Sequence, residues 1–257
     1  MLGVSDEQNL VIDLNKKENL SLWKILELDP ELHVAIHVNS KKKSNFHDKK
    51  ILPKADVFVA TGNIKQEYLE EKEYLLTETD FKKLKLNQVH YSGISVKKEN
   101  SKNYTITKIS PIPFNTIFGS YELGCGISVF VDKNSDVELN ESKIFKGWNT
   151  DIDSMIEFYI EYIPEIIELK ECINITKQKI IYKKIKSFAK NMLKHNIDNN
   201  INLQNFVFQG IGAFEEPYTA HYFYQNGLLS RDCYIPYYVD TGSGRHKGDF
   251  TVVIKPL

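Results

Sequence analysis

The chain has 257 residues, of which 42% are hydrophobic and 26% charged, as is typical of a globular protein with a buried core. The 33 Lys and Arg residues against 34 Asp and Glu residues leave a formal net charge of −1, so total charge neither indicates nor excludes a nucleic-acid binder. The sequence shows no signal peptide, no membrane-length apolar run and no closely spaced cysteine pair. We therefore expect a soluble cytoplasmic protein without a membrane partner, a zinc site or a disulfide framework.

The first half of the chain alternates between predicted helices and short strands. The signals are apolar residues at helical spacing and apolar–polar alternation. In chain order we expect a helix over 6–30, a strand over 33–38, a basic loop over 41–50, a strand over 56–59, a charged and partly helical segment over 64–87, and strands over 94–97 and 104–107. Within the charged segment, Asp80 is the expected helix N-cap.

The second half combines helices with a β-rich end. In chain order we expect an ambiguous glycine-containing apolar segment over 114–131, a helix over 150–170 interrupted at Pro164, a lysine-rich helix over 174–196, strands over 218–224, 233–239 and 250–255, and a turn at Asn226-Gly227. This mixture predicts one α/β (α+β) domain over 1–257. Its parts would be a core over about 30–135, a helical middle over 150–196 and a β-rich C-terminal part over 200–257.

Two short segments carry residues suited to phosphodiester chemistry. Asp56 starts one predicted strand, and Lys97 shares a face with Ser95 on a later strand. A carboxylate and the backbone carbonyl of Val96 are oxygen ligands of the kind Mg²⁺ prefers. A lysine can orient or deprotonate an attacking water, or neutralise developing charge. On residue types alone the plainer alternative is commoner, namely a turn aspartate and a solvated lysine.

The residues around this pair follow a longer pattern. It consists of PKADV at 53–57, GISVK at 93–97 continuing through SKNY at 101–104, the segments at 114–118 and 121–124, GSGR at 242–245 and TVVIKP at 251–256. These stretches, about residues 50–130 and 236–257, resemble the core of type II restriction endonucleases of the PD-(D/E)XK nuclease superfamily. The resemblance implies a mixed central sheet flanked by helices and Mg²⁺-dependent, sequence-specific hydrolysis of double-stranded DNA. It also implies that Asp56 binds the metal and that Lys97 is catalytic.

The sequence departs from this family at the second acid, two residues before the lysine, where Ser95 stands. A hydroxyl binds Mg²⁺ much more weakly than a carboxylate, so another acid is expected to fill the place. The candidates are Glu122, Glu99 and Glu7, in an order that stays open. The long interval between Asp56 and Lys97 predicts an insertion over 63–88 between the two core strands.

Contacts with DNA are predicted from the cations and from a glycine-rich loop over 241–247. Arginine can bind guanine through two hydrogen bonds, and the chain holds only two arginines. Backbone N–H groups of a glycine-rich loop can approach an anion, although the loop is equally well a hairpin connection. The basic segment over 41–50 can follow a phosphate backbone. The predicted DNA-binding residues are Arg245, Lys247, Ser243, Arg231, Lys98 and Lys102.

Palindromic target sites favour a homodimer, because its two-fold symmetry matches that of the DNA. Two alternatives remain open at this point. One is a catalytically inactive DNA- or RNA-binding module with the nuclease fold. The other is a nucleotide hydrolase in which the glycine-rich loop holds phosphate.

Overall fold

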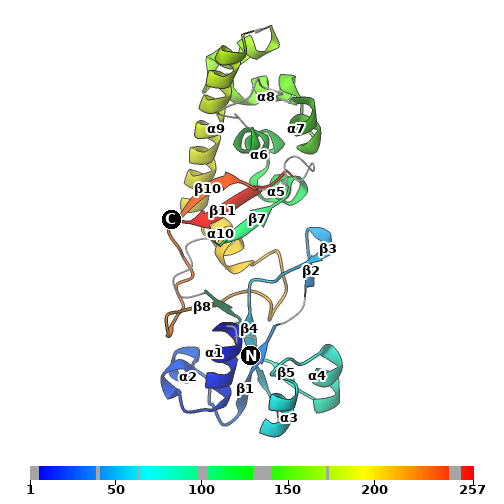
Figure 1. The fold of residues 1–257 in the computed structure, drawn as a ribbon, viewed down its shortest axis with the longest axis vertical. Helices are drawn as coiled ribbons and strands as arrows, with labels where there is room; N and C mark the ends of the chain where they lie inside the picture. Colours follow the sequence, from blue (N-terminus) through cyan, green and yellow to red (C-terminus); the bar gives the residue numbers. More distant parts are fainter. Residues whose placement is uncertain are drawn as a thin grey trace. The chain divides into compact units, whose positions relative to one another are not determined.

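The computed structural model describes residues 6–38, 41–62, 64–97, 104–129, 141–171, 174–242 and 250–257. The chain divides into two compact units (Figure 1). Unit 1 comprises Met1–Lys102 and Gln204–Ile235, and unit 2 comprises Asn103–Leu203 and Pro236–Leu257. Both units contain helices and strands, which confirms the predicted mixed α/β class. The single domain stays a prediction, but its expected parts differ from these units, because residues 204–235 return to the N-terminal one.

Unit 1 is built on a mixed six-stranded sheet with the order β1-β4-β6-β8-β9, in which β5 also pairs with β4. All pairs are antiparallel except β6 and β8, which run parallel. Its elements are α1 (Asp6–Asn15), α2 (Leu20–Leu26), β1 (His33–His37), β2 (Lys42–Ser44), β3 (His47–Ile51), β4 (Val57–Thr61), α3 (Gln66–Glu71), α4 (Glu78–Leu84), β5 (Asn87–Gln88), β6 (Ile94–Val96), the π-helical turn η2 (Asn205–Gln209), β8 (Tyr222–Gln225) and β9 (Leu228–Ser230).

The core of unit 1 lies between this sheet and the first two helices. Leu10 and Leu14 of α1 and Trp23 of α2 are almost completely buried, as are the strand residues Ile36 and Val59. The indole Nε1–H of Trp23 donates to the backbone oxygen of Leu14 at 3.1 Å, which joins the two helices. Burial of large apolar side chains stabilises this packing.

Asn15, at the end of α1, completes the hydrogen bonding of the edge strand β1. Its side-chain amide donates to the backbone oxygen of Ala35 at 2.8 Å, and its side-chain oxygen accepts from the N–H of Ala35 at 3.0 Å. Asn15→Ala would leave both backbone groups of Ala35 buried and unpaired, so we expect a loss of about 2–3 kcal/mol of stability. Chemical denaturation measures it, with the exposed Asn19→Ala as control. Equal stability of the two variants would contradict this role for Asn15.

Several predicted elements of unit 1 need correction. The helix expected over 6–30 is two helices, because the polar segment 16–19 interrupts it and Lys17 adopts a positive φ of 59°. The basic segment over 41–50 is largely the antiparallel hairpin β2–β3 rather than a loop. Asp80 is not an N-cap: Thr77 caps α4, and the Asp80 carboxylate accepts from the N–H of Thr77 at 2.9 Å, which completes a capping box. The strands at 33–38, 56–59 and 94–97 are confirmed.

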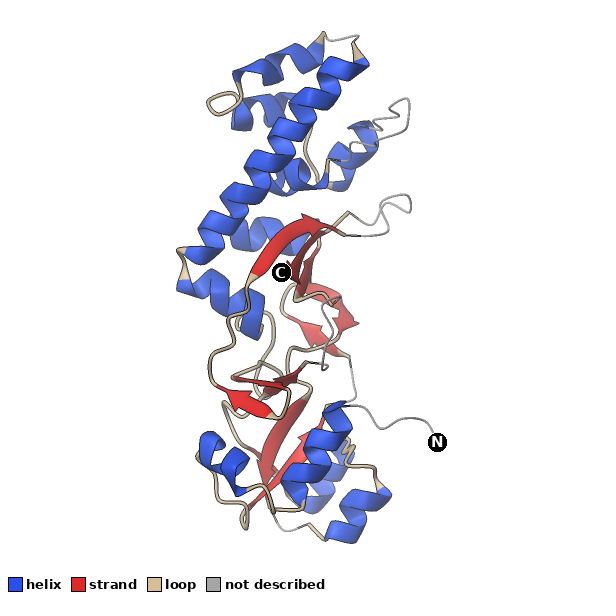
Figure 2. Ribbon diagram, turned by 60° about the vertical axis from the view of Figure 1, so that its left-hand side comes forward, coloured by secondary structure: helices blue, strands red, loops and turns tan. Residues whose placement is uncertain are grey.

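Unit 2 combines a helical layer with a three-stranded antiparallel sheet in the order β10-β11-β7. Its longest helix, α9, packs against α6 and β10 (Figure 2). Among the described residues, none of the helices combines the length and apolarity needed to cross a bilayer. The elements are β7 (Thr107–Ile109), α5 (Pro111–Phe118), α6 (Tyr121–Ser128), α7 (Glu141–Gly147), α8 (Ile152–Tyr159), the 3₁₀ helix η1 (Pro164–Lys170), α9 (Ile175–Asp198), α10 (Ile201–Gln204, ending at the unit boundary), β10 (Tyr237–Thr241) and β11 (Val252–Pro256).

Of the ambiguous segment over 114–131, the described residues 114–129 are largely helical and form most of α5 and all of α6, while 130 and 131 lie outside the described residues. Gly124 weakens a helix prediction from sequence, yet a Cβ at this position would collide with the Trp148 ring. The glycine therefore allows close approach rather than ending the helix. The strands expected over 104–107, 218–224 and 233–239 are shorter or displaced toward the C-terminus as β7, β8 and β10, whereas 250–255 corresponds to β11.

Candidate active site

Asp56 is held at the start of β4 by its backbone and by its side chain. Its N–H donates to the carbonyl of Ile94 at 2.9 Å, and its carbonyl accepts from the N–H of Val38 at 2.8 Å. The carboxylate Oδ2 accepts from the backbone N–H of Val96 at 2.8 Å. Antiparallel pairing of Val57 with Ile94 places the two strands side by side. The sheet therefore brings Asp56 next to the segment that carries Ser95 and Lys97.

Lys97, Ser95 and Asp56 form a short chain of polar contacts where the start of β4 lies beside β6. The Lys97 ammonium donates to Ser95 Oγ at 2.7 Å, and Ser95 Oγ lies 3.5 Å from Asp56 Oδ2. The backbone N–H of Lys97 donates to the carbonyl of Tyr224 at 2.9 Å, which extends the parallel pairing of β6 with β8. The structure thus brings together the three residues predicted to be catalytic.

A glycine positions this strand. A Cβ at Gly93 would overlap the backbone oxygen of Thr219, and the carbonyl of Gly93 accepts from the N–H groups of His221 and Tyr222. Only a residue without a side chain allows this approach of the two backbones. Gly93 therefore fixes the start of β6, two residues before Ser95.

Burial changes the acid–base properties of the cluster. The pKa of Asp56 is raised to about 6, chiefly because burial disfavours the charged carboxylate; Lys97 and the Val96 N–H oppose this rise, and the charge of Glu7 adds to it. Burial also lowers the pKa of Lys97, against the attraction of Asp56 and Glu7. A third group, Lys54, has its pKa lowered to about 7 by burial and then by the positive charge of Lys97.

Lys54 lies two residues before Asp56 but is anchored differently. Its ammonium donates to the backbone oxygen of Val207 at 2.6 Å, which joins the start of β4 to η2. The cluster therefore holds two amines with lowered pKa values and one carboxyl with a raised pKa. Perturbed pKa values of this kind are typical of functional sites, although structural networks also produce them.

Of the three acids considered for the second metal-ligand place, Glu7 is, among the described residues, the one whose charge acts on Asp56 and Lys97. Glu7 lies in the first turn of α1, its Oε2 is 3.3 Å from His37 Nε2, and its charge acts on both Asp56 and Lys97. Glu122 belongs to unit 2, where its carboxylate accepts from Ser120 and from Thr150. Glu99 lies outside the described residues.

Mg²⁺, the metal that the sequence resemblance implies, can be tested against these donors. No group of three or more His, Cys, Asp or Glu side chains suited to a metal ion occurs within the described part of the chain. Mg²⁺ commonly binds through one or two carboxylates and keeps several waters, so Asp56 and Glu7 are donors of the right kind. The N–H and C=O of a strand residue point to the same side, so the Val96 carbonyl faces the side of the Asp56 carboxylate. Asp56 and the Val96 carbonyl are therefore oxygen donors of the kind that Mg²⁺ binds.

The predicted DNA-binding residues are mostly outside the part of the chain that the structure describes. This holds for Lys98, Lys102, Ser243, Arg245 and Lys247. Arg231 is described and lies just after β9, in unit 1. Its guanidinium pairs with the Glu27 carboxylate at 2.7 Å and lies over the Tyr222 ring, 5.6 Å from the ring centroid. A guanine that contacts Arg231 would therefore share the guanidinium with Glu27 or displace this carboxylate.

Comparison of the chain with protein-family models, with curated proteins and with solved structures gives no match. The protein is therefore characterised by its own fold and by the geometry of its candidate site. They are a mixed sheet that unites Asp56, Ser95 and Lys97 at the adjoining ends of two strands, with Glu7 supplied by the first helix.

Proposed function

We propose that this protein is a type II restriction endonuclease, which hydrolyses phosphodiester bonds of double-stranded DNA at specific sequences with Mg²⁺. One observation carries the proposal. Asp56 and Lys97, far apart in sequence, meet around Ser95 at the adjoining ends of β4 and β6, in a partly buried polar cluster. An anchored carboxylate beside a lysine with a lowered pKa is suited to hydrolysis of a phosphodiester.

The residues take separate roles in this reaction. Asp56, Glu7 and the Val96 carbonyl would hold Mg²⁺, which when bound polarises a phosphoryl oxygen and makes bound water more acidic. The Val96 N–H fixes the carboxylate of Asp56 in place. Lys97, oriented by Ser95 Oγ, accepts a proton from the attacking water when neutral, or stabilises the developing negative charge when protonated.

The direct test is incubation of the protein with plasmid DNA, with and without Mg²⁺. We expect discrete fragments that appear only with the metal. The DNA should cover many sequences and methylation states, and ionic strength should be low because phosphate affinity falls steeply with salt. Absence of cleavage under all these conditions would contradict the proposal.

A second candidate is a DNA- or RNA-binding module with this fold that has lost catalysis. The observation that favours it is Ser95, whose hydroxyl stands at the second-acid place and already accepts from the Lys97 ammonium. Within the described residues, moreover, no three acid, His or Cys side chains gather as a metal site. Binding to nucleic acid without cleavage in either Mg²⁺ or Mn²⁺ would distinguish this candidate from the nuclease.

We expect Glu7→Gln to weaken the response to Mg²⁺, because it removes one of the two carboxylates of the cluster. The concentration of Mg²⁺ that gives half-maximal cleavage should rise about 10- to 100-fold. Asp6→Asn, the neighbouring acid in the first turn of α1, is the matched control and should leave this concentration nearly unchanged. Equal half-saturation for both variants would exclude Glu7 as the second acid.

The proposal includes a two-fold symmetric homodimer, because a palindromic site is matched by a symmetric protein. Sedimentation equilibrium of the free protein would measure its oligomeric state. A monomer that remains monomeric on cleavable DNA would contradict this part of the proposal and leave the hydrolytic chemistry intact.

A further inference from the structure

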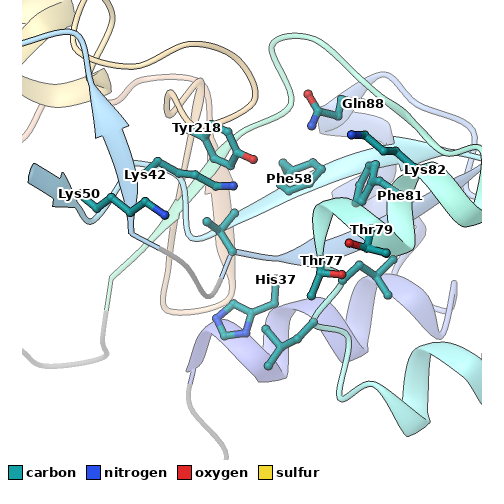
Figure 3. A pocket seen from close by; sticks show the side chains of 13 residues that line it. His37, Lys42, Lys50, Phe58, Thr77, Thr79, Phe81, Lys82, Gln88 and Tyr218 are labelled. Atoms are coloured by element: carbon teal, nitrogen blue, oxygen red, sulfur yellow. The ribbon is translucent and has the colours of Figure 1, made fainter. Parts of the chain in front are cut away.

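Unit 1 contains a pocket of about 710 Å³ beside the candidate active site (Figure 3). Its walls come from β1, the β2–β3 hairpin, β4, the segment before α4, α4 itself, β5 and the loop that carries Tyr218. This volume falls within the range of small-molecule sites in proteins, which is about 300–1,000 Å³. The pocket can therefore hold a ligand of the size of one nucleotide.

The charged side chains that line the pocket have one sign. Lys42 and Lys50 enter from the β2–β3 hairpin, and Lys82 of α4 points in from the opposite side (Figure 3). Among the described lining residues none is acidic, although the whole chain carries slightly more acidic than basic residues. A concave surface with cations on two sides attracts an anion.

Aromatic rings form the apolar part of the same pocket. The centroid of the Phe58 ring lies 5.7 Å from that of Phe81 and 6.4 Å from that of Tyr218. The Lys42 ammonium lies over the Tyr218 ring, 4.7 Å from its centroid. Aromatic rings beside cations are the combination that binds an unpaired base together with its phosphate. Inorganic phosphate has no base that could stack on these rings.

The pocket adjoins the candidate active site through β1. His37 lines the pocket and also contacts the Glu7 carboxylate at 3.3 Å. Val38 lines it too, and its N–H donates to the Asp56 carbonyl. A nucleotide in the pocket would thus lie against His37 and Val38, the two residues that also contact Glu7 and Asp56.

We propose that this pocket binds one unpaired nucleotide, with the base against Phe81 and Tyr218 and the strand's phosphates on either side facing Lys50 and Lys82. Polar side chains of Thr77, Thr79 and Gln88 on the pocket wall supply hydrogen-bonding groups for the edge of the base. The inference rests on the proposed nuclease function and deepens it: one nucleotide of the duplex substrate, turned out of its base stack, would give the strand a second contact beside the cluster of Asp56 and Lys97.

The test measures binding without cleavage. Fluorescence anisotropy with a labelled eight-nucleotide thymidine strand, in EDTA and at low salt, reports affinity for the full-length protein. Lys50→Ala/Lys82→Ala should weaken binding about 10-fold or more, since each lysine–phosphate contact contributes modestly and salt-dependently. Lys24→Ala/Lys83→Ala is the charge-matched control: both lysines are exposed, in α2 and in α4, and neither lines the pocket. It should bind within about twofold of the unmodified protein.

Competition identifies the ligand. Thymidine monophosphate should displace the labelled strand at a concentration at least about 10-fold below that of inorganic phosphate, because base stacking adds to the ionic contacts. Phe81→Leu, which keeps an apolar side chain, should reduce this advantage while leaving competition by phosphate unchanged. Equal competition by the two anions would reduce the pocket to a simple anion site and overturn the proposal. Equal affinities of the two lysine double variants would overturn it as well.

Because no divalent cation is present, these results are independent of cleavage. Binding that depends on Lys50 and Lys82 in a protein that never cuts DNA would support the pocket and contradict the nuclease. Cleavage by a protein whose double variants bind equally would do the reverse.

Discussion

Asp56→Asn and Lys97→Ala are each expected to lower the rate of DNA cleavage by about 10³-fold or more. The first change removes an anchored carboxylate from the place where the metal would bind, and the second removes the group that handles the proton or charge of the attacking water. Cleavage of plasmid DNA at saturating Mg²⁺, with single-turnover rates, measures the loss. Asp232→Asn and Lys24→Ala, which change two exposed residues outside the cluster, are the controls.

Each substitution also changes hydrogen bonds within the cluster, so folding must be measured alongside activity. Removal of Lys97 takes away the positive charge that opposes the rise in the pKa of Asp56, so a smaller fraction of this carboxyl is ionised at a given pH. Raising the pH should therefore recover part of the metal binding of Lys97→Ala but not that of Asp56→Asn. Full activity in either folded variant would show that this cluster is not the active site.

Lys54→Met is expected to make the protein more stable relative to the unmodified chain at neutral pH than at pH 10. The folded-state pKa of Lys54 is about 7, below its ordinary value of 10.5, chiefly because of burial. Between these two pH values the unfolded chain binds more protons than the folded one, so stability rises with pH. The slope from this group approaches about 1.4 kcal/mol per pH unit and sums to several kcal/mol over the interval.

The variant has no ammonium to bury, so this slope should disappear from it. Loss of the hydrogen bond to Val207 lowers the stability of Lys54→Met by an amount that does not depend on pH, so the change with pH carries the information. Denaturant titrations at pH 7, 8, 9 and 10 measure it, with the exposed Lys43→Met as control. A constant difference in stability between Lys54→Met and the unmodified protein would contradict a buried lysine with a lowered pKa.

Local patterns predicted most of the elements that build the site. The apolar run after Asp56 and the alternation around Ser95 are short-range signals of strands, and both strands are present as β4 and β6. The turn at Asn226-Gly227 is confirmed as well: both residues have positive φ and join β8 to β9. Where such signals failed, as in the helix expected over 6–30, the cause was also local, a polar segment with Lys17 in the left-handed region.

The sequence was a poorer guide to which residues make up the site. Glu7 was one of three candidate acids, and no spacing rule distinguished it from Glu122, because its approach depends on how α1 packs against β1. Lys54 was not singled out, since a lysine before a strand is usually solvated. Its role follows from a contact with Val207, a residue far along the chain.

The sequence by itself determined the α/β class and the strands that carry Asp56, Ser95 and Lys97, because alternation and turn residues act over a few neighbouring positions. Only the tertiary structure decided that β6 pairs with β8 in parallel, that the charge of Glu7 acts on Asp56, and that a basic aromatic pocket lies beside these residues. These features arise from contacts between distant segments, whose geometry depends on the packing of the whole unit. Packing also sets the burial that shifts the pKa values of Asp56 and Lys54, which residue types alone do not reveal.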